Sequence, residues 1–225
     1  AAIAASFNTP IAGIIFAMEV VLAEYTITGF IPVILASVAG TIVARLAYGS
    51  EPLLSAQQSF SMDLGELGLV LLLALLVSTA SASFVAIQRY CLRFAERPIW
   101  LRLGVAGTVT GLLALAAPQI MGVGHGTLVS LIDTPLPLLV LITIIVCKLI
   151  ASAFSIGLGM PGGMIGPNLF IGACIGTLLG QSMQLLVPGV VESVTLYALL
   201  GMAAMMSAVL NAPLAALMSL MEMTY

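Results

Sequence analysis

Long stretches without a charged side chain dominate this sequence. Five of them reach the roughly 20 residues that a helix needs to cross a hydrocarbon core ~30 Å thick. They are residues 25–44, 67–88, 103–124, 149–191 and 193–221. The last two are too long for a single span at about 1.5 Å per residue, so each is expected to break and fold back. Since no strand-like alternation is visible, the pattern predicts an all-α integral membrane protein with broken and re-entrant helices.

The composition supports this prediction. Of 225 residues, 61% are hydrophobic and 7% are charged, with a mean hydropathy of +1.24, which leaves too little polar surface for a water-soluble domain. We therefore expect one partial transmembrane domain over residues 1–225. The opening AAIAAS lacks a methionine, a basic region or a helix start, which is typical of a fragment that begins inside an element.

The sequence gives little sign of metal or catalytic chemistry. Cys91, Cys147 and Cys174 are isolated and the single histidine has no partner cluster, so neither a metal site nor a disulfide framework is expected. Hydrolase and metalloprotease motifs are also missing. We therefore expect no enzymatic activity, no cofactor and no nucleic-acid partner.

The cations are unevenly distributed. Arg89, Arg93, Arg97 and Arg102 lie in one connection between two predicted spans, with Glu96 as its single acid. By the positive-inside rule this connection is cytoplasmic; the alternative is a group of arginines that snorkel from helix ends without topological meaning. Lys148 stands alone in a predicted helix, where it either has a function within the membrane, pairs with a carboxylate, snorkels, or neutralises a local dipole.

A phrase near the start of the chain returns near its end. FNTPIAGIIFAMEVV at 7–21 and LNAPLAALMSLMEMT at 210–224 share an Asn, a Pro and a Glu at matching places. The pairs are Asn8 with Asn211, Pro10 with Pro213, and Glu19 with Glu222. This predicts an internal duplication, with the tail of a first repeat over about 1–120 and a second repeat over about 121–225. Each Asn can cap a helix and each Pro fits a first turn, so each phrase is expected to begin a helix after a break.

The repeated acids have a structural interpretation and a functional one. A bare charge at the midplane costs ~3 kcal/mol on insertion scales, so Glu19 and Glu222 are expected to have partners. We favour structural carboxylates bonded to neighbouring main chain at a helix end.

The glycine-rich segment GMPGGMIGP at 159–167 interrupts the longest uncharged stretch. If Met164 and Ile165 begin a helix that runs to about Leu186, their unpaired amides and the helix dipole form an anion site without a cation. The alternative is a re-entrant turn that packs dry between helices, and the residues alone do not decide. Gly172, Gly176 and Gly180, spaced by four, predict close approach of another helix.

These motifs together resemble the CLC family of chloride channels and chloride/proton antiporters. FNTPIAGIIFAMEV, the segment from Gly157 to Pro167, and GMAAMMSAVLNAPLAALMSLMEMT are similar to three successive family signatures, in order and at about the family spacing. The resemblance implies a homodimer in a lipid bilayer, with one pathway for small anions in each subunit and two halves of opposite orientation. It also implies chloride as the bound and transported ion, and a multi-pass location in a bacterial inner or plasma membrane.

By this resemblance, the family's anion-binding loop lies on Gly163, Met164, Ile165, Gly166 and Pro167, with Ile165 where a phenylalanine is usual. The serine loop and the gating glutamate would precede Ala1. The pore tyrosine would lie slightly beyond Tyr225, so that residue is not assigned.

Val20 stands where the antiporters commonly carry an internal proton glutamate, which favours passive chloride conduction. A chloride/proton antiporter and a non-transporting membrane scaffold are the alternatives. His125 is either a sensor of external protons or an ordinary loop residue.

Overall fold

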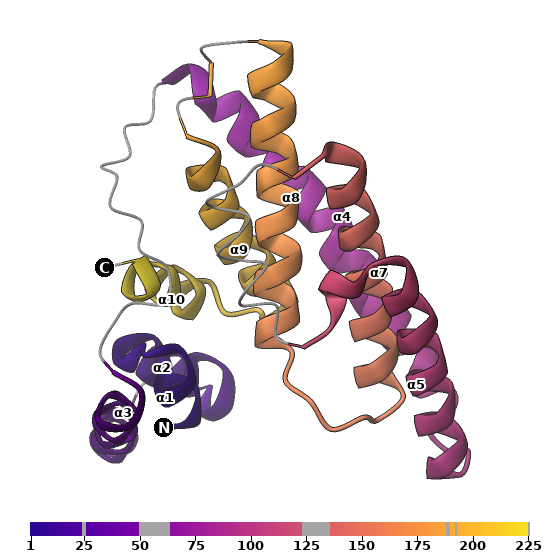
Figure 1. Ribbon diagram of the computed structural model, residues 1–225. Helices are drawn as coiled ribbons and strands as arrows, with labels where there is room; N and C mark the ends of the chain where they lie inside the picture. The colour runs from indigo at the N-terminus through magenta and orange to yellow at the C-terminus, as the bar shows by residue number, and fades with distance from the viewer. Residues whose placement is uncertain (24–25, 50–63, 123–135, 188–189, 192, 225) are drawn as a thin grey trace. The chain divides into compact units, whose positions relative to one another are not determined.

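The computed structural model is built from helices throughout the part of the chain that it describes (Figure 1). It describes residues 1–23, 26–49, 64–122, 136–187, 190–191 and 193–224. Five helices are long and apolar enough to span a membrane: α3 (Ile27–Tyr48), α4 (Leu67–Leu92), α5 (Ile99–Ala116), α7 (Leu138–Gly157) and α8 (Ile165–Leu186). Shorter helices are α1 (Ala2–Phe7), α2 (Pro10–Phe16), α9 (Val194–Leu210) and α10 (Pro213–Thr224). The described residues also include a π-helical turn, η1 (Ala17–Leu22), and two 3₁₀ turns, η2 (Leu64–Glu66) and η3 (Pro118–Ile120).

The chain divides into two compact units. The first comprises residues 1–59 and 206–225, and the second comprises residues 60–205. These two units are defined by which residues pack together, and not by similarity of sequence. The two repeats expected over about 1–120 and about 121–225 therefore remain a prediction.

In the first unit, α2 packs against α1, α3 and α10. The Ser37 hydroxyl of α3 donates to the Pro10 carbonyl at the start of α2, at 2.7 Å. A Cβ at Gly13 would come within 2.9 Å of Ala4 Cβ, so this glycine allows α1 and α2 to lie close together. The two segments of the repeated phrase are therefore brought into one unit, because α2 and α10 contact each other.

Both copies of the repeated phrase break the helix as predicted, but the asparagines act differently from our expectation. Asn8 is the C-cap of α1, with φ 56° and ψ 33°, and Thr9 rather than Asn8 is the N-cap of α2. Asn211 has the same left-handed conformation, φ 53°, between α9 and α10. Asparagine tolerates this region better than most residues, so it ends the preceding helix rather than capping the next one. Pro10 and Pro213 begin α2 and α10, as predicted.

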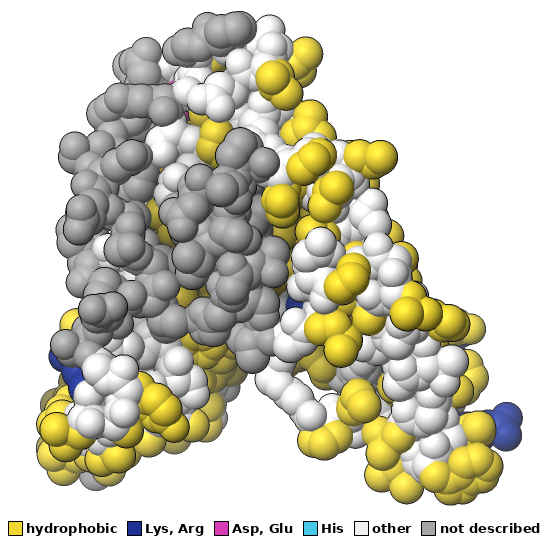
Figure 2. All heavy atoms as spheres, viewed as in Figure 1, with side chains coloured by type: hydrophobic (Ala, Val, Ile, Leu, Met, Phe, Trp, Pro, Cys, Tyr) yellow, Lys and Arg dark blue, Asp and Glu magenta, His cyan; other side chains and the backbone are white. Residues whose placement is uncertain are grey.

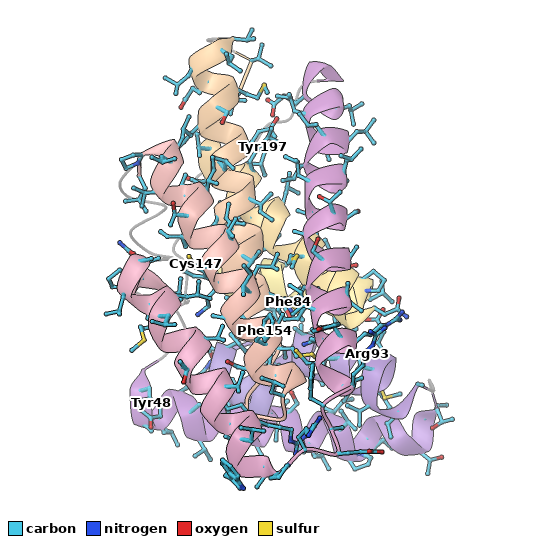
Figure 3. All side chains as sticks on the ribbon, turned by 90° about the vertical axis from the view of Figure 1, so that its right-hand side faces the viewer. Tyr48, Phe84, Arg93, Cys147, Phe154 and Tyr197 are labelled. Carbon is cyan, nitrogen blue, oxygen red and sulfur yellow. The ribbon has the colours of Figure 1, made fainter. Side chains whose placement is uncertain are left out.

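In the second unit, α7 packs against α4, α5 and α8. The largest buried side chains of this unit include Phe84 of α4 and Phe170 of α8. Figure 3 shows Phe84 in the interior beside α4, whereas Arg93 at the end of the same helix lies at the outer surface. Both long uncharged stretches are broken, at 158–164 and at 211–212, so the expected breaks are confirmed.

The glycines of α8 meet α9, as their spacing predicts. A Cβ at Gly172 would overlap the Gly201 carbonyl, and a Cβ at Gly176 would overlap the Tyr197 carbonyl. At Gly180 a Cβ would lie 3.2 Å from Val194 Cα. The two backbones are therefore in direct contact, which any larger side chain on this face would prevent.

Candidate anion-binding loop

The connection between α7 and α8 is an irregular segment between two helices that each have the length and hydropathy of a membrane span. α7 ends at Gly157, and α8 begins at Ile165 with Met164 as its N-cap. The first part of the connection is held by its own backbone: Gly159 N–H donates to Ile156 O at 3.0 Å and Met160 N–H to Ser155 O at 2.9 Å. Gly159 has φ +88°, a conformation that favours glycine. The predicted start of α8 and its end at Leu186 are both confirmed.

Main-chain N–H groups at the start of α8 lack acceptors. Among the described residues, no oxygen accepts a hydrogen bond from the amide of Gly163, Met164, Ile165 or Gly166. Pro167, in the same turn, has no N–H to satisfy. The helix dipole adds about half a positive charge at this end. The segment therefore offers several aligned donors to an anion, although no side chain within it carries a positive charge.

The main chain next to these donors is not covered by side chains of its own, because Gly162 and Gly163 carry none and both are exposed in the described part of the chain. A Cβ built on Gly162 or Gly163 would meet no atom within 4 Å. Glycine at both positions therefore lets a ligand approach the main chain closely.

Two polar side chains lie at or beside the first turn of α8. Gln88 of α4 places its Nε2 3.7 Å from Met164 Sδ, so the Met164 side chain is in contact with α4. Asn168 is 0% exposed, and both of its side-chain polar atoms are buried without a hydrogen-bond partner among the described residues. Buried amides are nearly always paired in folded proteins, so the unpaired side chain of Asn168 is an exception beside the start of α8. The sequence analysis did not single it out, although an Asn after Pro167 inside an apolar helix was a visible signal.

The repeated acids lie in the first unit and not in this loop. Glu222 Oε1 and Oε2 accept hydrogen bonds from the amides of Ile11 (3.0 Å) and Ala12 (2.7 Å) in the first turn of α2. Glu19 Oε1 and Oε2 accept from Leu214 (3.3 Å) and Ala215 (2.9 Å) in the first turn of α10. Glu222, from the second copy of the phrase, thus caps α2 in the first copy. Glu19, from the first copy, caps α10 in the second. Val20, next to Glu19 in η1, is 38% exposed in the described structure.

Lys148 lies in the middle of α7 and does not snorkel. It is 3% exposed, and its Nζ donates to the carbonyls of Ile120 at 2.6 Å and Gly122 at 2.9 Å. The ammonium also lies 5.2 Å from the Phe170 ring centroid. The Lys148 ammonium thus neutralises the dipoles of main-chain carbonyls at and just after the end of η3. Neutralisation of a local dipole was one of the roles that the sequence left open. His125 and Tyr225 lie outside the described residues.

A second buried polar pair was missed by the sequence analysis. The Tyr197 hydroxyl of α9 donates to Glu66 Oε2 at 2.8 Å, and both residues are buried. Figure 3 shows Tyr197 among the helices near the start of α4. The pair is 131 residues apart in sequence, so no local pattern could have connected them.

Helices that are broken at membrane depth and leave amides unpaired at a restart recur in membrane transporters, where the irregular backbone is buried in protein or lines a cavity. The chain belongs to the family described as voltage gated chloride channel, whose family model matches residues 1–225. It is a multi-pass integral membrane protein, and its bacterial relatives support a location in the bacterial inner membrane.

The curated relatives carry the same family description. A voltage-gated ClC-type chloride channel ClcB from Escherichia coli (strain SMS-3-5 / SECEC) is 33% identical over 229 residues, which cover 100% of this chain and 54% of the relative. ClcB from Escherichia coli O81 (strain ED1a) is 32% identical over the same share of each chain. The chain therefore spans about half the length of the curated relatives that it matches.

Solved structures share the fold at lower identity. A slow cyanobacterial Cl⁻/H⁺ antiporter matches with a TM-score of 0.84 and 20% identity, over 99% of this chain and 54% of that one. A CLC-type fluoride/proton antiporter matches with a TM-score of 0.77 and 22% identity, over 97% and 54%. The family and the fold expected from the motifs are thus confirmed. Relatives are described as channels or antiporters rather than enzymes, which confirms the non-enzymatic expectation.

Proposed function

We propose that this protein moves chloride, or a similar small anion, across the membrane, and that the amides of Gly163, Met164, Ile165 and Gly166 form part of its anion site. The observation that carries this proposal is the set of N–H groups at the start of α8 that have no acceptor among the described residues, next to two exposed glycines, Gly162 and Gly163. Membership of the voltage gated chloride channel family supports the choice of ion. Main-chain donors also explain why Ile165 is acceptable where the family usually has phenylalanine. By the same family argument, the protein is proposed to work as a homodimer with one pathway in each subunit.

The proposal is tested by removing one amide while keeping the helix. Met164→Pro deletes the N–H at a position whose φ of −82° is close to the range of proline, and Gly163 before it is the residue least restricted by a following proline. Met164→Ala shortens the side chain equally but keeps the amide. A hydrogen bond to a charged group is worth about 1.5–3 kcal/mol, so we expect roughly tenfold or more loss of chloride affinity in Met164→Pro.

The measurement is chloride binding by calorimetry and chloride flux from liposomes, with the complete protein. Met164→Ala is expected to behave nearly as wild type. Equal affinity in the two variants would refute a role for this amide. Absence of any flux from the wild-type protein would instead favour the non-transporting scaffold.

We further propose that the anion moves by passive conduction, without exchange for protons. This proposal rests on Val20, which stands where the antiporters of the family commonly carry an internal proton glutamate. The solved structures reported above are described as antiporters, so their titles do not favour a channel. With equal chloride on both sides and a pH gradient, a passive channel gives no shift in reversal potential, whereas an antiporter does. We expect no shift in the wild type. A shift in the wild-type protein would establish the chloride/proton antiporter in its place.

A further inference from the structure

A cavity of about 390 Å³ lies at the end of the α4–α5 hairpin, in the second unit. Its apolar walls include Phe94, Leu101, Val105 and Phe154. They come from the connection after α4, from α5 and from α7, and a small core of Cys91, Ala106 and Leu158 packs beside them. Figure 3 shows Phe154 on α7 facing the neighbouring helices. An apolar cavity of this size is large enough for part of a hydrocarbon chain.

Two arginines also line this cavity. Arg97 and Arg102 are part of its wall, and the described structure records no acidic partner for either. The Nε of Arg102 is buried and has no hydrogen-bond partner among the residues that the structure describes. Arginine carries five N–H donors in a fixed fork, so the two guanidinium groups bring hydrogen-bond donors to the wall of an otherwise apolar cavity.

The surrounding charges have the same sign. Arg89 lies in the last turn of α4 and Arg93 is the C-cap of that helix, with the Arg93 guanidinium carbon 5.5 Å from the Tyr90 ring centroid. Glu96 is the single acid between residues 89 and 102, and it is exposed. Figure 2 shows Lys and Arg side chains projecting at the lower right, beside hydrophobic side chains. Four cations against one anion produce a positive potential at the mouth of the cavity.

The position of the cavity relates it to a membrane surface. α4 and α5 are both candidate spans, and the cavity lies where they join, on the side that the arginines predict to be cytoplasmic. Trp100, two residues before Arg102, is 71% exposed in the first turn of α5. Tryptophan at the end of a span is typical of the headgroup region. A ligand here is therefore reached from the lipid, with its polar end at the interface.

We propose that this cavity binds an anionic phospholipid of the cytoplasmic leaflet. Its phosphate accepts hydrogen bonds from the guanidinium groups of Arg97 and Arg102, and an acyl chain lies against Leu101, Val105 and Phe154. The apolar walls favour a lipid over a free phosphate, because a soluble anion gains nothing from them. The arginines favour an anionic headgroup over a zwitterionic one, because each basic residue near an anionic surface adds about 1 kcal/mol.

The site also contacts the loop that leads to α8. The Arg102 Nη1 lies 3.5 Å from the position that a Cβ on Gly159 would occupy. A phosphate held by Arg102 would therefore lie close to Gly159, in the connection that leads to α8. Binding itself is measured without reference to transport, so the proposal stands or fails independently of the proposed function.

Trp100, the single tryptophan in this sequence, provides the readout. The complete protein, with any tryptophan elsewhere replaced by phenylalanine, is titrated in detergent with phosphatidylglycerol or phosphatidylcholine carrying brominated acyl chains. Quenching of Trp100 fluorescence gives the relative affinity for each lipid. We expect phosphatidylglycerol to bind about 25-fold more tightly, from two arginines at about fivefold each.

Three variants make the test specific. Arg97→Gln with Arg102→Gln is expected to abolish the preference for phosphatidylglycerol. Arg89→Gln removes a charge that lies outside the cavity wall, and it is expected to lower the preference much less than the double variant does. Val105→Phe fills the cavity without changing charge and is expected to weaken both lipids. Equal affinity for the two lipids in the wild type, or an unchanged preference in the double arginine variant, would overturn the proposal. Competition by millimolar glycerol phosphate as effective as the lipid would also overturn it, by showing that a soluble anion is the ligand.

Discussion

The Glu222 carboxylate lies 2.7 Å from the amide nitrogen of Ala12, at the first turn of a helix 210 residues earlier in the chain. Glu19 makes the equivalent contact with Ala215, at 2.9 Å. Each acid accepts from two successive amides, so each helix start receives a charge where its dipole is positive. The exchange joins the two copies of the repeated phrase, and it gives each acid a partner within an apolar unit.

Glu222→Ala is expected to destabilise the protein by about 2 kcal/mol or more, because two amides lose a charged acceptor. Glu19→Ala is expected to have a similar effect, slightly smaller because the Leu214 bond is longer at 3.3 Å. Chemical unfolding in detergent measures both. Glu96→Ala, in an exposed connection, is the matched control and should be neutral. Stability equal to that of the control would exclude a capping role.

Gly176→Ala is expected to lower the stability by about 3 kcal/mol or more, since overpacking typically costs 1–3 kcal/mol and the new Cβ would overlap main chain rather than a side chain. Gly107→Ala of α5 is the control, because a Cβ there meets nothing within 4 Å. That change is expected to be neutral or slightly stabilising, as alanine is the better helix former. Melting temperatures of the two variants in detergent compare them. If both tolerate alanine equally, the backbone contact between α8 and α9 is wrong.

Lys148→Met is expected to destabilise the protein by about 2–3 kcal/mol, because the Ile120 and Gly122 carbonyls lose a charged donor inside the protein. Chemical unfolding measures this change, and chloride flux per folded molecule is measured in parallel. A structural role predicts lower stability with little change in flux for the molecules that remain folded. Loss of flux with unchanged stability would show that the ammonium acts on the anion instead.

Tyr197→Phe is expected to cost about 1–3 kcal/mol, since it removes the hydroxyl that donates to Glu66 and leaves a buried carboxylate without that donor. Glu66→Gln should cost less, because the amide oxygen still accepts from the hydroxyl. The exposed Tyr90→Phe is the control for loss of a phenol oxygen. Unfolding transitions that coincide for Tyr197→Phe and Tyr90→Phe would contradict the structural importance of the pair.

The sequence alone determined the class of fold and the main breaks, because these depend on local properties. Charge-free length sets the spans, and glycine and proline set where a helix cannot continue. Met164 and Ile165 were therefore placed correctly at the start of α8, and the glycines of α8 correctly predicted a close helix contact.

Tertiary structure decided the partners of the polar groups. The sequence showed that Glu19 and Glu222 occupy matching places in a repeated phrase. Which helix start each carboxylate caps depends on the packing of α2 against α10. Lys148 finds carbonyls and Tyr197 finds Glu66 across long sequence separations, where no periodicity acts. In an apolar interior a polar group must be paired, yet the sequence does not specify which chain segment supplies the partner, because that depends on how the helices pack.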